Sequence, residues 1–202
     1  MVQTDGVTDV WLSNTPLGIG AVSSTNPVIT GGTINNTTIG ATTPSTGAFT
    51  TLSSTGNFTP SQTNGIVGTT TNNNANAGSV GEFVTSTALG SSLSSGVATN
   101  LTSISLTAGD WDVTGNVVYL AAGTTVIQVI ITGSSATSGA FPAVPLYSQM
   151  NLTFAAGAVA SQVAPKQRFS LTTTTTIFLI AQCNFITSTL TASGNIQARR
   201  VR

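Results

Sequence analysis

Few residues in this chain could perform acid–base, redox or metal chemistry. The 202 residues include no histidine, so the commonest general base and metal ligand is missing. The one cysteine, Cys183, lies in an apolar segment, where we expect a buried thiol that acts as a small hydrophobe. The acidic residues number five, namely Asp5, Asp9, Glu82, Asp110 and Asp112. We therefore predict no catalytic residue, no cofactor site and no metal site, and expect that the protein is not an enzyme.

The pair Asp110 and Asp112 is the strongest candidate for chemistry. On a β-strand the two carboxylates would project from the same face, where they could act as a pair or bind Ca²⁺. A calcium site needs more oxygen ligands than these two supply, and glycoside cleavage needs a tuned pair of acids in a chain that has few. We interpret the pair as part of a solvated strand face. The Gly-Ile-Gly at 18–20 lacks a preceding strand and a following helix, which indicates a turn and not a phosphate loop.

Charge is sparse and unevenly placed along the sequence. The net charge is zero, and all five acids precede the five bases, which are Lys166, Arg168, Arg199, Arg200 and Arg202. Five scattered cations make a poor surface for nucleic acid, so none is expected as a partner. The terminal Ala-Arg-Arg-Val-Arg is interpreted as a solvated strand end, with pairing to carboxylates of a neighbouring chain as the alternative.

The sequence also bears on the compartment. The opening Met-Val-Gln-Thr-Asp-Gly-Val has neither a basic nor an apolar stretch, and no apolar run approaches the roughly 18 residues that span a bilayer. We expect no secretory signal, no membrane insertion and assembly in a cytoplasm.

From about residue 81, apolar segments alternate with turn residues, as in an all-β domain. The pattern predicts strands at 81–87, 97–106, 110–120, 124–133, 146–154, 166–172, 174–185 and 192–202. This number and spacing suit a jelly-roll-like β-sandwich over 81–202. In the third strand Trp111, Val113 and Gly115 would share one face, opposite Asp110 and Asp112.

The strand at 174–185, TTTIFLIAQCNF, is unusually apolar, which indicates that both of its faces are covered. Ile177 and Leu179 would lie on one face with Ala181, and Phe178 and Ile180 on the other. We expect one face to pack in the sandwich core and the other against a neighbouring subunit of a trimer. The pattern does not decide which face is which.

The first 80 residues are rich in Thr, Asn and Gly and have a different organisation. Residues 1–30 contain one apolar cluster, Val10, Trp11 and Leu12, which is interpreted as a docking segment because Trp is a common interface anchor. Residues 31–60 are interpreted as a short intertwined trimeric β shaft, and residues 61–80 as a neck. The apolar residues that would meet at the shaft axis are Ile29, Ile34, Ile39, Phe49, Leu52 and Phe58; the alternative is a loose linker.

Several stretches are similar to a known family. GGTINNTTIGATTPSTGAFTTLSSTG at 31–56 resembles the repeat of tailed-bacteriophage fibre and head-fibre proteins. TSISLTAGDWDVTGNV at 102–117, KQRFSLTTTTTIFLIAQCNF at 166–185 and the ending IQARRVR resemble the C-terminal module of phage structural proteins. The resemblance implies a trimeric virion fibre with an attachment segment, a thin shaft and a β-sandwich knob, and it assigns no receptor-binding residue.

The resulting hypothesis is a homotrimeric head fibre or capsid decoration protein, assembled in the host cytoplasm and resident in the virion. Its N-terminus would bind the major capsid protein or another virion protein, and a host cell-surface glycan would be a further partner. A tail fibre or tail-tip receptor-binding protein is the first alternative. A surface polysaccharide depolymerase and a host-encoded adhesin are less favoured, because of the low acid count and the missing export signal.

Overall fold

The computed structural model describes residues 50–57, 68 and 70–202. The chain divides into two compact units, Met1–Ile66 and Val67–Arg202. In the first unit only 50–57 are described; they form no strand, and the Ser54 hydroxyl donates to the carbonyl of Gly56 over 2.9 Å. Leu52 is exposed there, whereas the other proposed shaft residues and the docking residues Val10, Trp11 and Leu12 lie outside the described residues.

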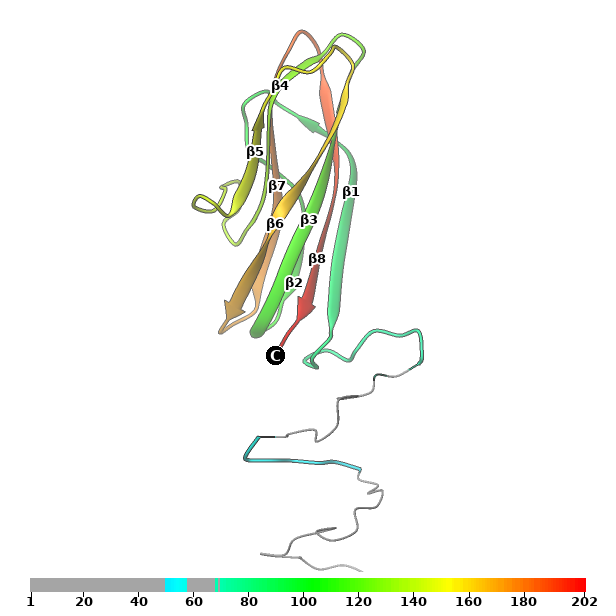
Figure 1. Cartoon of the computed structure of the whole chain (residues 1–202), viewed down its shortest axis with the longest axis vertical. Helices are drawn as coiled ribbons and strands as arrows, with labels where there is room; N and C mark the ends of the chain where they lie inside the picture. Colours follow the sequence, from blue (N-terminus) through cyan, green and yellow to red (C-terminus); the bar gives the residue numbers. More distant parts are fainter. Residues whose placement is uncertain (1–49, 58–67, 69) are drawn as a thin grey trace, which may run out of the picture. The chain divides into compact units, whose positions relative to one another are not determined.

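The second unit is an all-β sandwich without a helix among its described residues (Figure 1). Its strands are β1 (Phe83–Leu93), β2 (Thr99–Leu106), β3 (Gly109–Ala121), β4 (Val126–Ser135), β5 (Tyr147–Asn151), β6 (Val159–Leu171), β7 (Thr175–Ile186) and β8 (Leu190–Arg200). They form two antiparallel sheets, ordered β1-β8-β3-β6 and β2-β7-β4-β5. Every connection except β4–β5 passes from one sheet to the other, which is the jelly-roll arrangement and confirms the predicted fold class.

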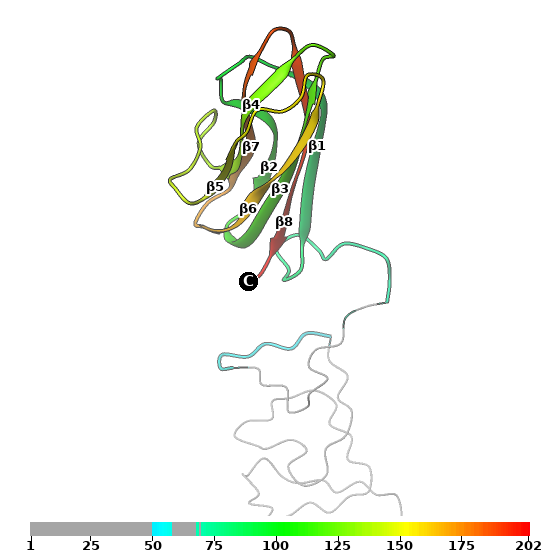
Figure 2. The same ribbon diagram turned by 45° about the horizontal axis from the view of Figure 1, so that its top comes forward.

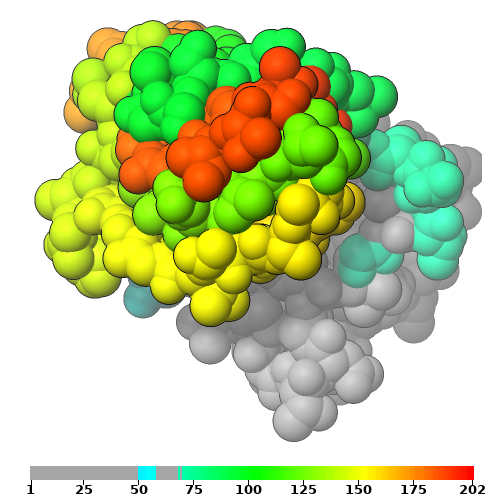
Figure 3. Space-filling view, turned by 90° about the horizontal axis from the view of Figure 1, so that it is seen from above, coloured from blue at the N-terminus to red at the C-terminus, as the bar shows by residue number. Residues whose placement is uncertain are grey.

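The two ends of the sandwich differ in their loops. We call the end where β1 begins and β8 ends the basal end; the C-terminus lies there, and the two sheets face each other above it (Figure 2). The opposite, distal end is formed by the loops 94–98, 122–125, 152–158 and 187–189 (Figure 3). None of these four loops contains a charged residue, so the distal end is built from small, apolar and hydroxyl side chains.

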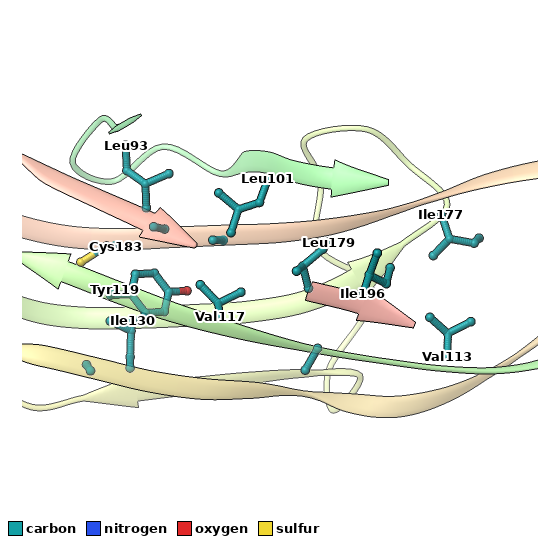
Figure 4. Packing of buried hydrophobic residues seen from close by; sticks show 14 of the residues in the cluster. Leu93, Leu101, Val113, Val117, Tyr119, Ile130, Ile177, Leu179, Cys183 and Ile196 are labelled. Carbon is teal, nitrogen blue, oxygen red and sulfur yellow. The ribbon is translucent and has the colours of Figure 1, made fainter. Parts of the chain in front are cut away.

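The core lies between the sheets and follows the alternation of the strands. Ile177, Leu179 and Cys183 of β7 and Val113 of β3 point into it (Figure 4). Ala181 of β7 and Trp111 of β3 belong to the same buried cluster. Cys183 is buried, which confirms the expected buried thiol, and burial raises its pKa to about 11.

Leu179 fits into a space left by two glycines of the facing sheet. A Cβ at Gly115 would lie 2.7 Å from Leu179 Cδ1, and a Cβ at Gly194 would lie 2.7 Å from Leu179 Cδ2. Because the two glycines belong to the adjacent strands β3 and β8, their missing side chains form a slot for one leucine. The slot allows the sheets to pack without a void at this point.

The outer face of β7 is covered in part by the chain's own loop 136–146. Ile180 is fully buried but lies outside the core cluster; its strand partners are Gly133 on β4 and Asn100 on β2. A Cβ at Gly133 would lie 3.1 Å from the ring of Phe141. The side-chain amide of Asn100 donates to the Ser138 hydroxyl and accepts a bond from the backbone amide of Gly139. The loop therefore crosses β7 at Ile180, so burial of this side chain does not require the neighbouring subunit that we expected. Phe178, on the same face, is half-buried.

The largest error in the strand prediction concerns β6, which begins at Val159 instead of 166. In its first half the larger apolar side chains face solvent and smaller or polar ones face the core. Val159 and Val163 are exposed, while Ala160, Gln162 and Ala164 point inward. Small and polar residues on the core face hide the alternation that usually marks a strand. The first strand was also predicted too short, because a bulge between Ala88 and Ser91 interrupts its pattern.

The slot around Leu179 can be tested by a double-mutant cycle. Gly194→Ala should destabilise the sandwich by about 1–3 kcal/mol through overpacking, and Leu179→Ala by about 2–5 kcal/mol through a cavity. The double variant should lose less than the sum, because the added methyl occupies space that the leucine vacated. Urea unfolding measures all three. Gly123→Ala, with nothing within 4 Å of its Cβ, is the control and should be neutral; strict additivity of the pair would contradict the slot.

Candidate functional site

The charged side chains of the described chain gather in the basal half of the sandwich. They come from the basal parts of β3, β6 and β8, from the residue that precedes β1 and from the chain that follows β8. These eight residues are Glu82, Asp110, Asp112, Lys166, Arg168, Arg199, Arg200 and Arg202. The uneven order of acids and bases in the sequence is thus resolved in space, since antiparallel strands return the late bases to the early acids. Each of the three described carboxylates is ion-paired.

Arg200 is the centre of this region. Only 5% of its surface is exposed, and its guanidinium lies over the ring of Trp111, 4.4 Å from the centroid. Its Nε donates to Glu82 over 3.0 Å, and other guanidinium nitrogens donate to the Thr107 hydroxyl and the Ala108 carbonyl. The buried cation is therefore both paired and hydrogen-bonded, as burial of a charge requires.

Backbone bonds join the same residues, and we call this set the basal clamp. The amide of Gly81 donates to the carbonyl of Arg200, and the amide of Arg200 donates to that of Glu82, over 3.0 and 2.9 Å. The amide of Asp110 donates to the carbonyl of Arg202 over 3.1 Å, and the amide of Val201 donates to the carbonyl of Asp110 over 2.9 Å. The clamp fastens the segment that leads into β1 to the C-terminal residues.

Asp110 forms the second part of the clamp. It is 5% exposed and accepts two bonds from Arg168, of 2.7 and 2.6 Å, and one from Arg202, of 2.9 Å. The hydrogen bond from Arg168 is the main cause that lowers the pKa of Asp110, and the Gly78 amide is the main cause that lowers the pKa of Glu82. Such carboxyls remain ionised near neutral pH and are poor general acids.

The structure corrects two interpretations made from the sequence. The ending was interpreted as a solvated strand end, but Arg200 is buried and pairs within its own chain. The alternation of Ile196, Ala198 and Arg200 carried the signal, since all three point to the core side of β8. The second interpretation placed Asp110 and Asp112 on a solvated strand face. Asp110 lies on the expected face, but arginines cover it. Asp112 is partly exposed and pairs with Lys166 over 2.6 Å.

The residues predicted for the knob are brought together only in part. Trp111, Val113, Ile177 and Leu179 all line the core, while Ile180 and Phe178 lie on the outer face of β7. The residues of 81–202 that sequence reasoning missed are Phe83, Glu82, Gln197, Arg199 and Arg200. Only long-range strand pairing places them near one another, because Phe83 pairs with Arg199 and Arg199 with Asp112. Within the described ranges no cluster of three His, Cys, Asp or Glu side chains suited to a metal occurs, nor does a helix with the length and apolarity to cross a membrane.

Comparison with known proteins gives distant structural matches. No family model matches the sequence, and no curated protein matches it. Among solved structures, the chain is similar to that of the infectious bursal disease virus Gx strain (TM-score 0.40, 18% identity) over 59% of this chain and 32% of that one. The VP2 subviral particle of infectious bursal disease virus gives a TM-score of 0.38 and 16% identity over the same shares. The chain spans about a third of the length of these viral chains, and at such scores function has to be argued from the chain itself.

Acid should loosen the basal clamp. The pKa values of Glu82 and Asp110 are lower in the folded protein than their ordinary values, so their stabilisation is present above about pH 4 and is lost as the pH falls through the folded values. We expect the melting temperature, followed by circular dichroism, to be level from pH 7 to 5 and to fall below about pH 4.

Glu82→Gln provides the matched variant for this profile. Removal of the anion beside buried Arg200 should cost about 3–5 kcal/mol at pH 7 and should reduce the further loss in acid. Asp112→Asn, which breaks a partly exposed pair, should cost no more than about 1 kcal/mol. If Glu82→Gln loses stability in acid as steeply as the wild type does, Glu82 is not a source of the acid sensitivity.

Proposed function

We propose that this protein is a virion structural protein, a homotrimeric head fibre or capsid decoration whose residues 1–30 bind the major capsid protein or another virion protein. The observation that carries the proposal is the combination of two parts in one chain. A jelly-roll sandwich follows a segment, 31–56, that resembles the repeat of phage fibre proteins. Jelly rolls recur in viral capsid and lectin domains, but a fold alone does not determine function. The proposal therefore depends on the occurrence of this fold together with the fibre-like repeat in one chain.

The state of the carboxylates favours a non-enzymatic role over a depolymerase. Glycoside cleavage uses a carboxylic acid whose pKa is raised. In the knob, ion pairs and hydrogen bonds lower the pKa values of Asp110 and Glu82, and Asp112 is paired with Lys166. These residues are suited to holding the basal end together.

The side of the sandwich formed by β5 and β6 is suited to contact with further copies of the chain. Val159 and Val163 are 62% and 58% exposed, and Met150 and Leu152 on the neighbouring edge are exposed as well. We call these four residues the β5–β6 strip. A run of exposed apolar side chains without charge commonly marks a protein interface. A trimer that buries the strip would leave the outer face of β1, β8 and the basal part of β3 open for contact with a host-surface glycan, with affinity multiplied by three copies.

Removal of residues 1–26 should abolish association with the virion and leave a trimer. The measurements are immunoblotting of purified particles and native mass spectrometry of the protein. Virions that retain the truncated protein would overturn the attachment role, and a monomeric full-length protein would overturn the trimer.

Imaging of intact particles separates the two locations: density on the capsid supports a head fibre, and density at the tail supports a tail fibre.

Val163→Asp should weaken the trimer without unfolding the knob, because Val163 is largely exposed in the single chain. We expect dissociation on dilution at a protein concentration at least about tenfold higher than for the wild type. For one trimer in equilibrium with three monomers this is about a hundredfold change in the dissociation constant, or about 2.7 kcal/mol per trimer. Leu89→Asp is the matched control, since Leu89 is exposed on β1, at the opposite edge of the same sheet. Equal dissociation of both variants and the wild type would place the contact elsewhere.

A further inference from the structure

The outer face of the β1-β8-β3-β6 sheet is hollowed at its basal end. A depression of about 360 Å³ takes residues from all four strands, with Phe83 from β1, Arg199 and Gln197 from β8, Thr114 and Asp112 from β3, and Lys166 from β6. A second hollow, of about 800 Å³, adjoins it, shares Phe83 and Arg199, and is otherwise lined largely by the asparagines of 72–76. We call the two together the basal groove. Each of the two hollows has a volume within the range of small-ligand sites.

Arg199 gives the groove its charge. Four of the five basic side chains are paired with carboxylates, whereas Arg199 has no carboxylate partner among the described residues. Its guanidinium lies over the ring of Phe83, 5.7 Å from the centroid. The one carboxylate in the lining, Asp112, is offset by Lys166 at 2.6 Å. A single excess positive charge therefore remains in the groove, and it is carried by a side chain able to bind a carboxylate through two parallel hydrogen bonds.

The other lining groups are suited to a hydroxylated ring. Phe83 is 36% exposed, and Asn74 holds its position by a donated bond to the Phe83 carbonyl (2.8 Å) and an accepted bond from its amide (2.9 Å). These bonds hold the backbone of Phe83, and its partly exposed ring offers an apolar surface. Beside it, the Gln197 side chain is exposed and makes no hydrogen bond to the described part of the chain, so its amide can serve as donor and acceptor.

We propose that the basal groove binds a carboxylated sugar residue, such as a hexuronic acid, of a surface polysaccharide. The carboxylate pairs with Arg199, the apolar face of the sugar ring lies against Phe83, and its hydroxyls bond Gln197 and Thr114. This inference rests on the proposed function, because one small, open groove binds weakly and becomes effective through the three copies of a trimer. A nucleic acid fits less well, since the groove has one excess cation and no basic stripe.

The test is a titration of the full-length protein followed by NMR, with observation of ligand signals by saturation transfer. The probes are a glucuronic-acid-containing tetrasaccharide, its carboxyl-reduced neutral counterpart and inorganic phosphate. We expect binding of the acidic saccharide, with affinity at least about tenfold weaker for the neutral one, as the loss of a charge-assisted bond implies. No binding, equal binding of the neutral sugar, or phosphate binding as tight as the saccharide's would overturn the proposal.

Variants assign the binding to the groove. Arg199→Gln should weaken the acidic saccharide at least about tenfold, and Gln197→Ala should weaken both saccharides. Gln128→Ala is the matched control, because Gln128 is exposed on β4 in the other sheet. Unchanged affinity in Arg199→Gln with an unchanged melting temperature would contradict the site. The virion role is tested by a different experiment. If protein that lacks residues 1–26 stays on particles, the proposed attachment is wrong, and this result does not affect the groove. The saccharide titration tests the groove alone.

Discussion

The structure depends on the close approach of two sheets at Leu179. Its two methyl groups occupy the positions where side chains of Gly115 and Gly194 would lie, so one residue of β7 interlocks with two strands of the facing sheet. Because interiors are packed as densely as organic crystals, this contact sets the spacing of the sheets and allows Trp111, Val113 and Ile177 to be buried between them. The apolarity of β7 therefore serves first to join the layers within one chain.

Strand β8 divides its two faces between different tasks. Ile196, Ala198 and Arg200 point inward. Arg200 closes the basal end of the core with a cation that stacks on Trp111 and pairs with Glu82. Gln197 and Arg199 point outward into the basal groove. The clamp thus gives the groove a rigid base, because neighbouring residues of the same strand are held from below by buried bonds.

Charge is separated from the contact surfaces that we propose for other copies. The basal half of the knob holds the described charges, while the distal loops and the β5–β6 strip contain none. An uncharged strip can be buried against a second copy without desolvation of an ion, and the free guanidinium of Arg199 remains where a small anionic ligand can reach it. One sandwich can therefore combine self-association on one edge with ligand binding on a face.

The sequence by itself determined the class of the fold and the faces of its strongest strands. Eight apolar segments with turn residues predicted the sandwich, and alternation placed Trp111 and Val113 opposite Asp110, because strand periodicity is a local property. Alternation failed at β6, where valines face solvent and alanines face the core. Only the tertiary structure decided that Leu179 and not Phe178 faces the core, that the chain's own loop covers Ile180, and that Arg200 is buried. Each of these, like the meeting of Phe83 with Arg199, depends on pairing between residues far apart in the chain, for which a local pattern contains no information.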